Sequence, residues 1–113
     1  MIQPGVYNIK LQRRADYSVL LDFKDSNKVA INLTGWTVAA SVWDQARSTK
    51  YADFTVDYVD RSQGRVRLRL GYAATTTFPN ETVYDVLLIN TNGEREYYLE
   101  GTILATEGYT TVP

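Results

Sequence analysis

The sequence offers few side chains with which an enzyme could do chemistry. Its 113 residues include no Cys and no His, which removes thiol chemistry and the commonest general base. Ser and Thr therefore lack a partner for nucleophilic catalysis. The carboxylate pairs Asp22–Asp25 and Glu96–Glu100 could in principle serve a glycosidase, but each lies in a turn or on an alternating polar face. We expect a protein that is not an enzyme and has no cofactor or metal.

Charge gives the chain no general attraction to nucleic acids or anionic membranes. Twelve basic and thirteen acidic residues leave a net charge of -1. The stripe of Arg65, Arg67 and Arg69 could contact phosphates, yet Asp57 is expected to face it across a hairpin. We interpret the stripe as a solvated face with weak ion pairs. The charges therefore predict no nucleic acid partner. No apolar window approaches the length of a membrane span, so we expect no membrane partner either.

Alternation of apolar and polar residues recurs along the chain and predicts β-strands. The runs are bounded by Gly, Asn, Asp and Pro, which is typical of an all-β sandwich or barrel. With 44% hydrophobic and 22% charged residues, the composition is that of an ordinary globular protein, and we expect one domain over residues 1–113. The predicted strands, about seven in number, cover residues 6–11, 16–23, 36–43, 53–60, 65–70, 82–89 and 94–104.

Turn residues predict how several of these strands are joined. Residues 61–64 should close a hairpin in which the numbers of paired residues sum to an even value, so that the apolar positions of both strands share a face. Asn92-Gly93 predicts a second hairpin. Two alanines followed by Phe78-Pro79 indicate one helical turn near residues 72–78. In the last strand, Tyr97 is expected to share the face of Leu99, Gly101 and Ile103.

Two Trp residues lie seven positions apart in the predicted strand that follows the Thr34-Gly35 corner. The alternation places Trp36 with the aliphatic residues and Trp43 on the opposite face, among small and polar neighbours. We therefore expect Trp36 to anchor the core. Trp43 either covers the open end of the sandwich or contacts a partner, and Tyr51 is a second candidate for the same contact surface.

The ends of the sequence, residues 1–5 and 107–113, carry no packing pattern and are expected to be extended tails. An extended tail can add a strand to the exposed sheet edge of a neighbouring protein. Tyr109 and Val112 would then supply side-chain anchors.

The order of these elements resembles that of a known group of proteins. The relevant features are a short N-terminal strand and the stretches "DYSVLLDFKDSNKVAINLTGWTVAASVWD", "GRVRLRL", "GYAATTTFPNETVYDVLL" and "NGEREYYLEGTILAT". The resemblance covers roughly Val6 to Thr106. They are similar to the small immunoglobulin-like domains of tailed-phage virion proteins, as in the N-terminal domain of baseplate upper proteins. The resemblance implies an immunoglobulin-like antiparallel β-sandwich that serves as a structural adaptor in a phage tail or baseplate.

The expected function is therefore that of a non-enzymatic virion protein, made in the host cytoplasm, that docks onto other virion structural proteins. Such a subunit would be present in multiple copies of a symmetric assembly. A capsid decoration protein is an alternative within the same class. A carbohydrate-binding module is an alternative from a different class, because nine Tyr and two Trp are enough to build a platform on which sugars stack.

Overall fold

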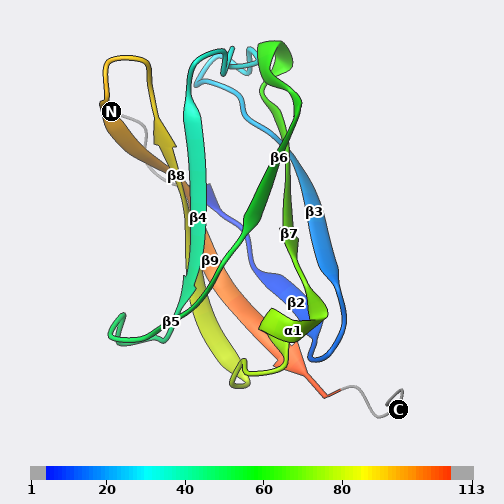
Figure 1. Cartoon of the computed structure of the whole chain (residues 1–113). Coiled ribbons are helices and arrows are strands. Elements are labelled where there is room, and N and C mark those ends of the chain that lie inside the picture. Colours follow the sequence, from blue (N-terminus) through cyan, green and yellow to red (C-terminus); the bar gives the residue numbers. More distant parts are fainter. Residues whose placement is uncertain (1–4, 108–113) are drawn as a thin grey trace.

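A computed structural model describes residues 5–107, which form an all-β sandwich of two sheets (Figure 1). The larger sheet has the strand order β1–β9–β8–β4–β5, with β2 also paired to β9, and the smaller sheet has the order β3–β7–β6. The strands of the larger sheet are β1 (Gly5–Val6), β2 (Ile9–Gln12), β4 (Thr37–Trp43), β5 (Lys50–Asp53), β8 (Glu81–Ile89) and β9 (Arg95–Thr106). Those of the smaller sheet are β3 (Tyr17–Asp22), β6 (Thr55–Asp60) and β7 (Arg65–Leu70).

The strand connections are those of an immunoglobulin-like sandwich. In that fold β3, β7 and β6 correspond to strands B, E and D, and β9, β8, β4 and β5 to strands G, F, C and C′. Strands β1 and β2 run parallel to β9, whereas all other described strand pairs are antiparallel. The chain changes sheets at Phe54, whose N–H donates to the Ala40 carbonyl at 2.9 Å. The prediction of an all-β, immunoglobulin-like sandwich is confirmed.

The core lies between the two sheets and follows from the alternation in each strand. In β7 the side chains of Val66, Leu68 and Leu70 are buried, while the arginines between them are exposed. The facing strands β4 and β8 bury every second residue in the same way. Loop residues complete the core: Phe23 and Leu33 are fully buried, and Phe78 nearly so.

The hairpin of β6 and β7 has the predicted register. The paired residues Thr55 and Arg69, and likewise Asp57 and Arg67, have numbers with an even sum. Asp57 forms an ion pair of 2.6 Å with Arg69, and Arg65 forms one of 2.9 Å with Asp22. Two arginines of the stripe are therefore paired within the smaller sheet, as the sequence predicts. A 3-10 turn, η1 (Arg61–Gln63), connects the two strands.

Several predicted boundaries need correction. The single strand predicted over residues 6–11 is split into β1 and β2, and Gly5, predicted to be part of a tail, already belongs to β1. Asp53 does not continue into β6 but ends β5 in the other sheet. At the other end, Glu107 pairs with Arg13 at 2.9 Å. The expected helical turn is present as α1 (Tyr72–Thr75).

A β-bulge in β9 overturns one prediction about the larger sheet. Val86 pairs with Leu99 but Leu87 pairs with Tyr97, so Tyr98 is the extra residue. Tyr98 packs inward, with its ring edge-on to Phe23 at a centroid distance of 4.7 Å. Tyr97 is consequently turned to the opposite face, away from the core residue Ile103 whose face it was expected to share.

The two Trp residues lie on opposite sides of the sheet, as predicted. Trp36 precedes β4 and packs against the core, but it is only partly buried. Trp43 ends β4 on the outer side and is not among the side chains that pack against the core. We therefore expect truncation of Trp36 to lower the free energy of unfolding less than truncation of a fully buried aromatic residue would.

Candidate functional site

The outer side of the larger sheet carries aromatic, hydroxyl and carboxylate side chains close together. Cross-strand pairing brings them together in rows: Trp43 lies beside Val83, Ser41 beside Asp85, and Leu87 beside Tyr97. We call this surface the outer sheet face. It consists of Ala39, Ser41, Trp43, Val83, Asp85, Leu87, Tyr97 and Glu100.

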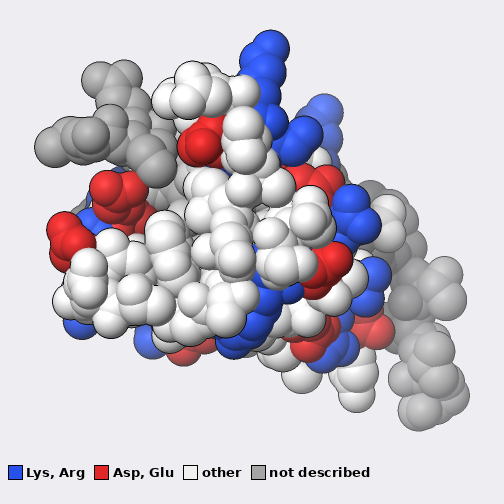
Figure 2. Space-filling model, turned by 90° about the horizontal axis from the view of Figure 1, so that it is seen from above, with Lys and Arg blue, Asp and Glu red and all other residues white. Residues whose placement is uncertain are grey.

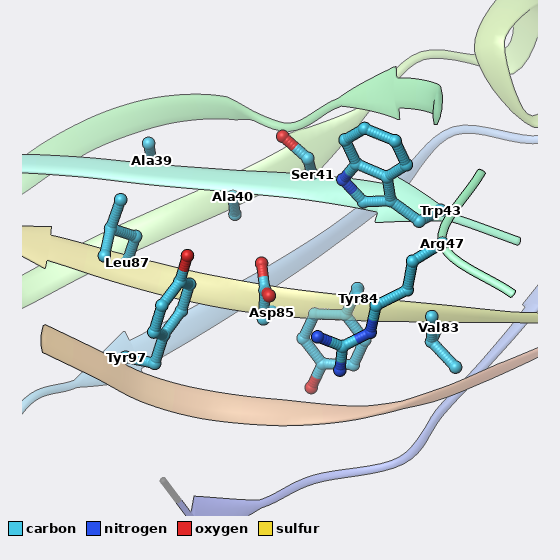
Figure 3. A pocket seen from close by; sticks show the side chains of 10 residues that line it. All are labelled: Ala39, Ala40, Ser41, Trp43, Arg47, Val83, Tyr84, Asp85, Leu87 and Tyr97. Carbon is cyan, nitrogen blue, oxygen red and sulfur yellow. The ribbon is translucent and has the colours of Figure 1, made fainter. Parts of the chain in front are cut away.

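A shallow hollow of about 310 Å³ is set into the outer sheet face. Figure 3 shows Asp85 near its middle, with Tyr97 on one side and Trp43 and Arg47 on the other. The hollow is open to solvent, and its floor is formed by strands β4 and β8. The hollow therefore has an aromatic residue at each side and a carboxylate between them. Aromatic residues are enriched at protein interfaces.

Two β-bulges in the larger sheet decide which aromatic side chains lie on the outer sheet face. The Tyr97 side chain is 51% exposed because the bulge at Tyr98 turns it outward. A second bulge, in β5, makes Tyr51 the extra residue beside the Val42–Trp43 step. Tyr51 turns inward and its ring lies 6.3 Å from that of Phe78. The structure therefore does not bring Tyr51 together with Trp43 on one surface.

A loop between β4 and β5 holds Arg47 over the hollow. Arg47 has a φ of 58°, a left-handed conformation that is uncommon for a residue other than Gly, Asn or Asp. Asp44 fixes this loop, because its carboxylate accepts hydrogen bonds from the Ser48 N–H at 2.7 Å and the Ser48 hydroxyl at 2.7 Å. These hydrogen bonds also lower the pKa of Asp44, with the side-chain bond from Ser48 as the main cause. The loop thus holds a cation beside the sheet.

Asp85 and Glu100 lie directly opposite each other across β8 and β9. Burial raises the pKa of the Asp85 carboxyl, the charge of Arg47 opposes the rise, and Glu100 adds to it. Across the adjacent strand, Ser41 donates to Asp53 at 2.6 Å and so does not serve Asp85. Like charges placed opposite each other in a sheet destabilise it.

We expect Asp85→Asn to stabilise the protein at pH 7 by about 0.2 to 1 kcal/mol, because it removes a partly desolvated charge that opposes Glu100. The pKa of Asp85 in the folded chain lies above the ordinary value of 3.8, so ionisation lowers stability as the pH rises through that range. The gain should be present at pH 7 and vanish near pH 3. Urea unfolding at both pH values measures it; an equal gain at both would show that charge is not the cause.

Other predicted site residues are placed elsewhere or cannot be placed. Tyr109 and Val112, the expected anchors of a C-terminal tail, lie outside the described residues. Asp22 and Asp25 do not form a catalytic pair: Asp22 binds Arg65, and Asp25 accepts the N–H groups of Asn27 and Val29 in a turn. Within residues 5–107, no group of three or more metal-ligating side chains is arranged to hold a metal ion.

Two features of the sequence indicate this site but did not enter the strand prediction. Asp85 interrupts the apolar run "VYDVLLI" and places a carboxylate on the solvent side of a central strand. The adjacent Tyr97-Tyr98 pair breaks the alternation in the same way and marks the bulge.

Surface charge is mixed on the end of the sandwich that Figure 2 shows, where acidic and basic groups surround a largely uncharged area. No helix in the described part of the chain has the length and apolar character to cross a membrane. A scan against models of known protein families and a search of curated proteins both found no match.

Proposed function

We propose that the chain is a non-enzymatic structural protein of a tailed-phage virion, which docks onto a larger tail or baseplate assembly through the outer sheet face. The observation that carries the docking role is the pairing of exposed Tyr97 and partly exposed Trp43 around the hollow at Asp85. Aromatic residues of this kind dominate the binding energy of many protein interfaces. The virion setting is supported by the resemblance of strand and turn order to phage baseplate domains.

The immunoglobulin-like sandwich suits this role physically. The outer sheet face lies mainly on β4 and β8, the central strands of the larger sheet. Each of these strands is paired on both sides. A surface on paired strands is more rigid than one on loops, so little conformational entropy is lost when a partner binds. We propose that the subunit is present in multiple copies around the symmetry axis of the particle.

Docking through this face predicts a large effect of aromatic truncation on assembly. Tyr97→Ala and Trp43→Ala should each weaken attachment to the particle by roughly tenfold or more, as for central aromatic residues of interfaces. Quantitative mass spectrometry of purified particles from the virus that encodes the chain gives the occupancy. The thermal unfolding midpoint of the isolated variants should change little.

Leu20→Ala is the matched control for this experiment. Leu20 is 48% exposed, close to the 51% of Tyr97, but it lies on the outer side of the smaller sheet. Its truncation should leave the occupancy unchanged. Absence of the chain from the particles would refute the virion role, and equal losses for Leu20→Ala and Tyr97→Ala would refute the outer sheet face as the docking surface.

A carbohydrate-binding module is the second candidate, and the hollow itself favours it. Tyr97 and Trp43 could stack against sugar rings while Asp85 accepts hydrogen bonds from sugar hydroxyls. A glycan array separates the two functions. Specific binding of one sugar, lost in Trp43→Ala, would support the module and count against a purely structural role. A capsid decoration protein would instead be found with the capsid shells when purified particles are separated into heads and tails before mass spectrometry.

A further inference from the structure

The outer sheet face is an unpartnered surface whose charges indicate what covers it. Exposed Tyr97 and partly exposed Trp43 supply its aromatic area, and Leu87 and Val83 supply aliphatic area between them. The charged groups at the same place are Asp85, Glu100 and Arg47. They decide between a basic, an acidic and a neutral partner.

Asp85 and Glu100 differ from the aspartates Asp22, Asp53 and Asp57, which also lie on strands. Asp22, Asp53 and Asp57 each form an ion pair, at 2.9, 3.1 and 2.6 Å respectively. Among the hydrogen bonds and ion pairs of residues 5–107, none involves the carboxylate of Asp85 or Glu100. Two neighbouring carboxylates on one face thus keep their acceptor sites open toward solvent.

Arg47 supplies the only nearby positive charge within the described residues that lowers the pKa of Asp85. It lines the hollow together with Asp85, and it lines a second, smaller hollow beside it together with Asp85 and Glu100. Within the described chain it forms no ion pair with either carboxylate. One cation beside two carboxylates leaves a negative charge uncompensated. An acidic partner would be repelled by that charge, and a neutral one would leave it desolvated at cost.

We propose that the hollow on the outer sheet face receives a basic side chain, Arg or Lys, from the protein on which this chain docks. The side chain enters between Tyr97 and Trp43 and pairs with Asp85 and Glu100. Arg fits best, because its planar guanidinium binds carboxylates through two hydrogen bonds and stacks on aromatic faces. This inference rests on the proposed docking function and adds the chemistry of the partner.

The test uses N-acetyl-arginine methylamide as a probe, with N-acetyl-citrulline methylamide as its uncharged counterpart of nearly the same shape. Each is titrated into the isotope-labelled protein at millimolar concentrations, and amide and indole NMR shifts are followed. The arginine probe should give saturable shifts at the Trp43 indole and at Asp85 and Glu100. The indole of Trp36, on the other side of the sheet, serves as an internal reference.

Matched variants show whether the carboxylates are responsible. The double variant Asp85→Asn with Glu100→Gln should weaken binding of the arginine probe at least tenfold and leave citrulline without effect. Asp57→Asn, which removes a carboxylate from the smaller sheet, should leave binding unchanged. Equal shifts for both probes, no saturable shift at Trp43, or full binding by the double variant would each overturn the proposal. Shifts caused only by a sugar would assign the hollow to a glycan instead.

The outcome is separable from that of the proposed function. If the chain occupies particles and Tyr97→Ala reduces that occupancy, but the double carboxylate variant assembles normally, the basic partner is refuted while the docking role stands. If the arginine probe binds as expected but the chain is absent from particles, the virion role is refuted and the chemistry of the hollow stands.

Discussion

Phe23→Ala is expected to lower the free energy of unfolding by about 3 to 5 kcal/mol, the range for truncating a buried aromatic residue. Phe23 is fully buried and its ring meets Tyr98 edge-on at 4.7 Å. The Tyr98 hydroxyl in turn donates to the Lys24 carbonyl at 3.0 Å and accepts from the Lys24 N–H at 2.9 Å. These contacts join the end of β3 to the bulge in β9, so the substitution leaves a cavity between the two sheets.

Chemical denaturation of the isolated protein measures this loss, with Tyr72→Ala as the control. The Tyr72 side chain is 63% exposed, and its truncation should change stability by less than about 0.5 kcal/mol. A loss at Tyr72 as large as the loss at Phe23 would contradict the described packing of the sandwich.

Gly101→Ala is the second substitution with a large expected effect, because it acts on the backbone. A Cβ at position 101 would overlap the Tyr7 carbonyl group, so the N-terminal segment must move away from β9. Three hydrogen bonds hold that segment: Tyr7 N–H to the Glu100 carbonyl at 3.0 Å, the Tyr84 hydroxyl to the Tyr7 carbonyl at 2.5 Å, and Thr102 N–H to Asn8 Oδ1 at 3.1 Å. Their loss should cost about 2 to 4 kcal/mol.

Hydrogen exchange locates the damage as well as measuring it. In Gly101→Ala the amides of Tyr7 and Thr102 should lose protection before those of β7 do. Gly71→Ala is the control, since a Cβ there would meet no atom within 4 Å. Unchanged protection at Tyr7 in Gly101→Ala would mean that β1 does not lie along β9 as described.

The sandwich could be predicted from the sequence because apolar and polar residues alternate regularly in its strands. Arg65 to Leu70 alternates without exception, and the same alternation sets both faces of β7. The hairpin at Asn92-Gly93 was also predictable, since Gly93 adopts the left-handed φ of 82° that such turns need. These features are local, and each follows from a few neighbouring residues.

The candidate site was only partly predictable, because bulges and loops set it up. An extra residue at Tyr98 reverses the face of Tyr97. The Tyr97-Tyr98 pair breaks the alternation there, but alternation alone does not show which residue is the extra one. Similarly, an extra residue at Tyr51 separates it from Trp43. The position of Arg47 depends on hydrogen bonds to Asp44 that no periodic pattern records.

Another non-local contact that the pattern missed involves Arg61. Its guanidinium lies 3.6 Å from the centre of the Tyr58 ring and donates to the carbonyls of Leu33 and Trp36 at 3.1 and 2.7 Å. These carbonyls belong to the loop that leads into β4. Arg61 therefore ties the smaller sheet to the start of the strand that ends in Trp43, a tertiary contact between segments far apart in sequence.

Site-specific photo-cross-linking is the most direct test of whether the outer sheet face is the docking surface. A photoreactive phenylalanine derivative replaces Leu87 on that face or, as the control, Arg67 on the outer side of the smaller sheet. After assembly and illumination of particles, we expect a covalent adduct with another virion protein from position 87 and none from position 67. An adduct from position 67 alone, or from neither position in particles that contain the chain, would contradict it.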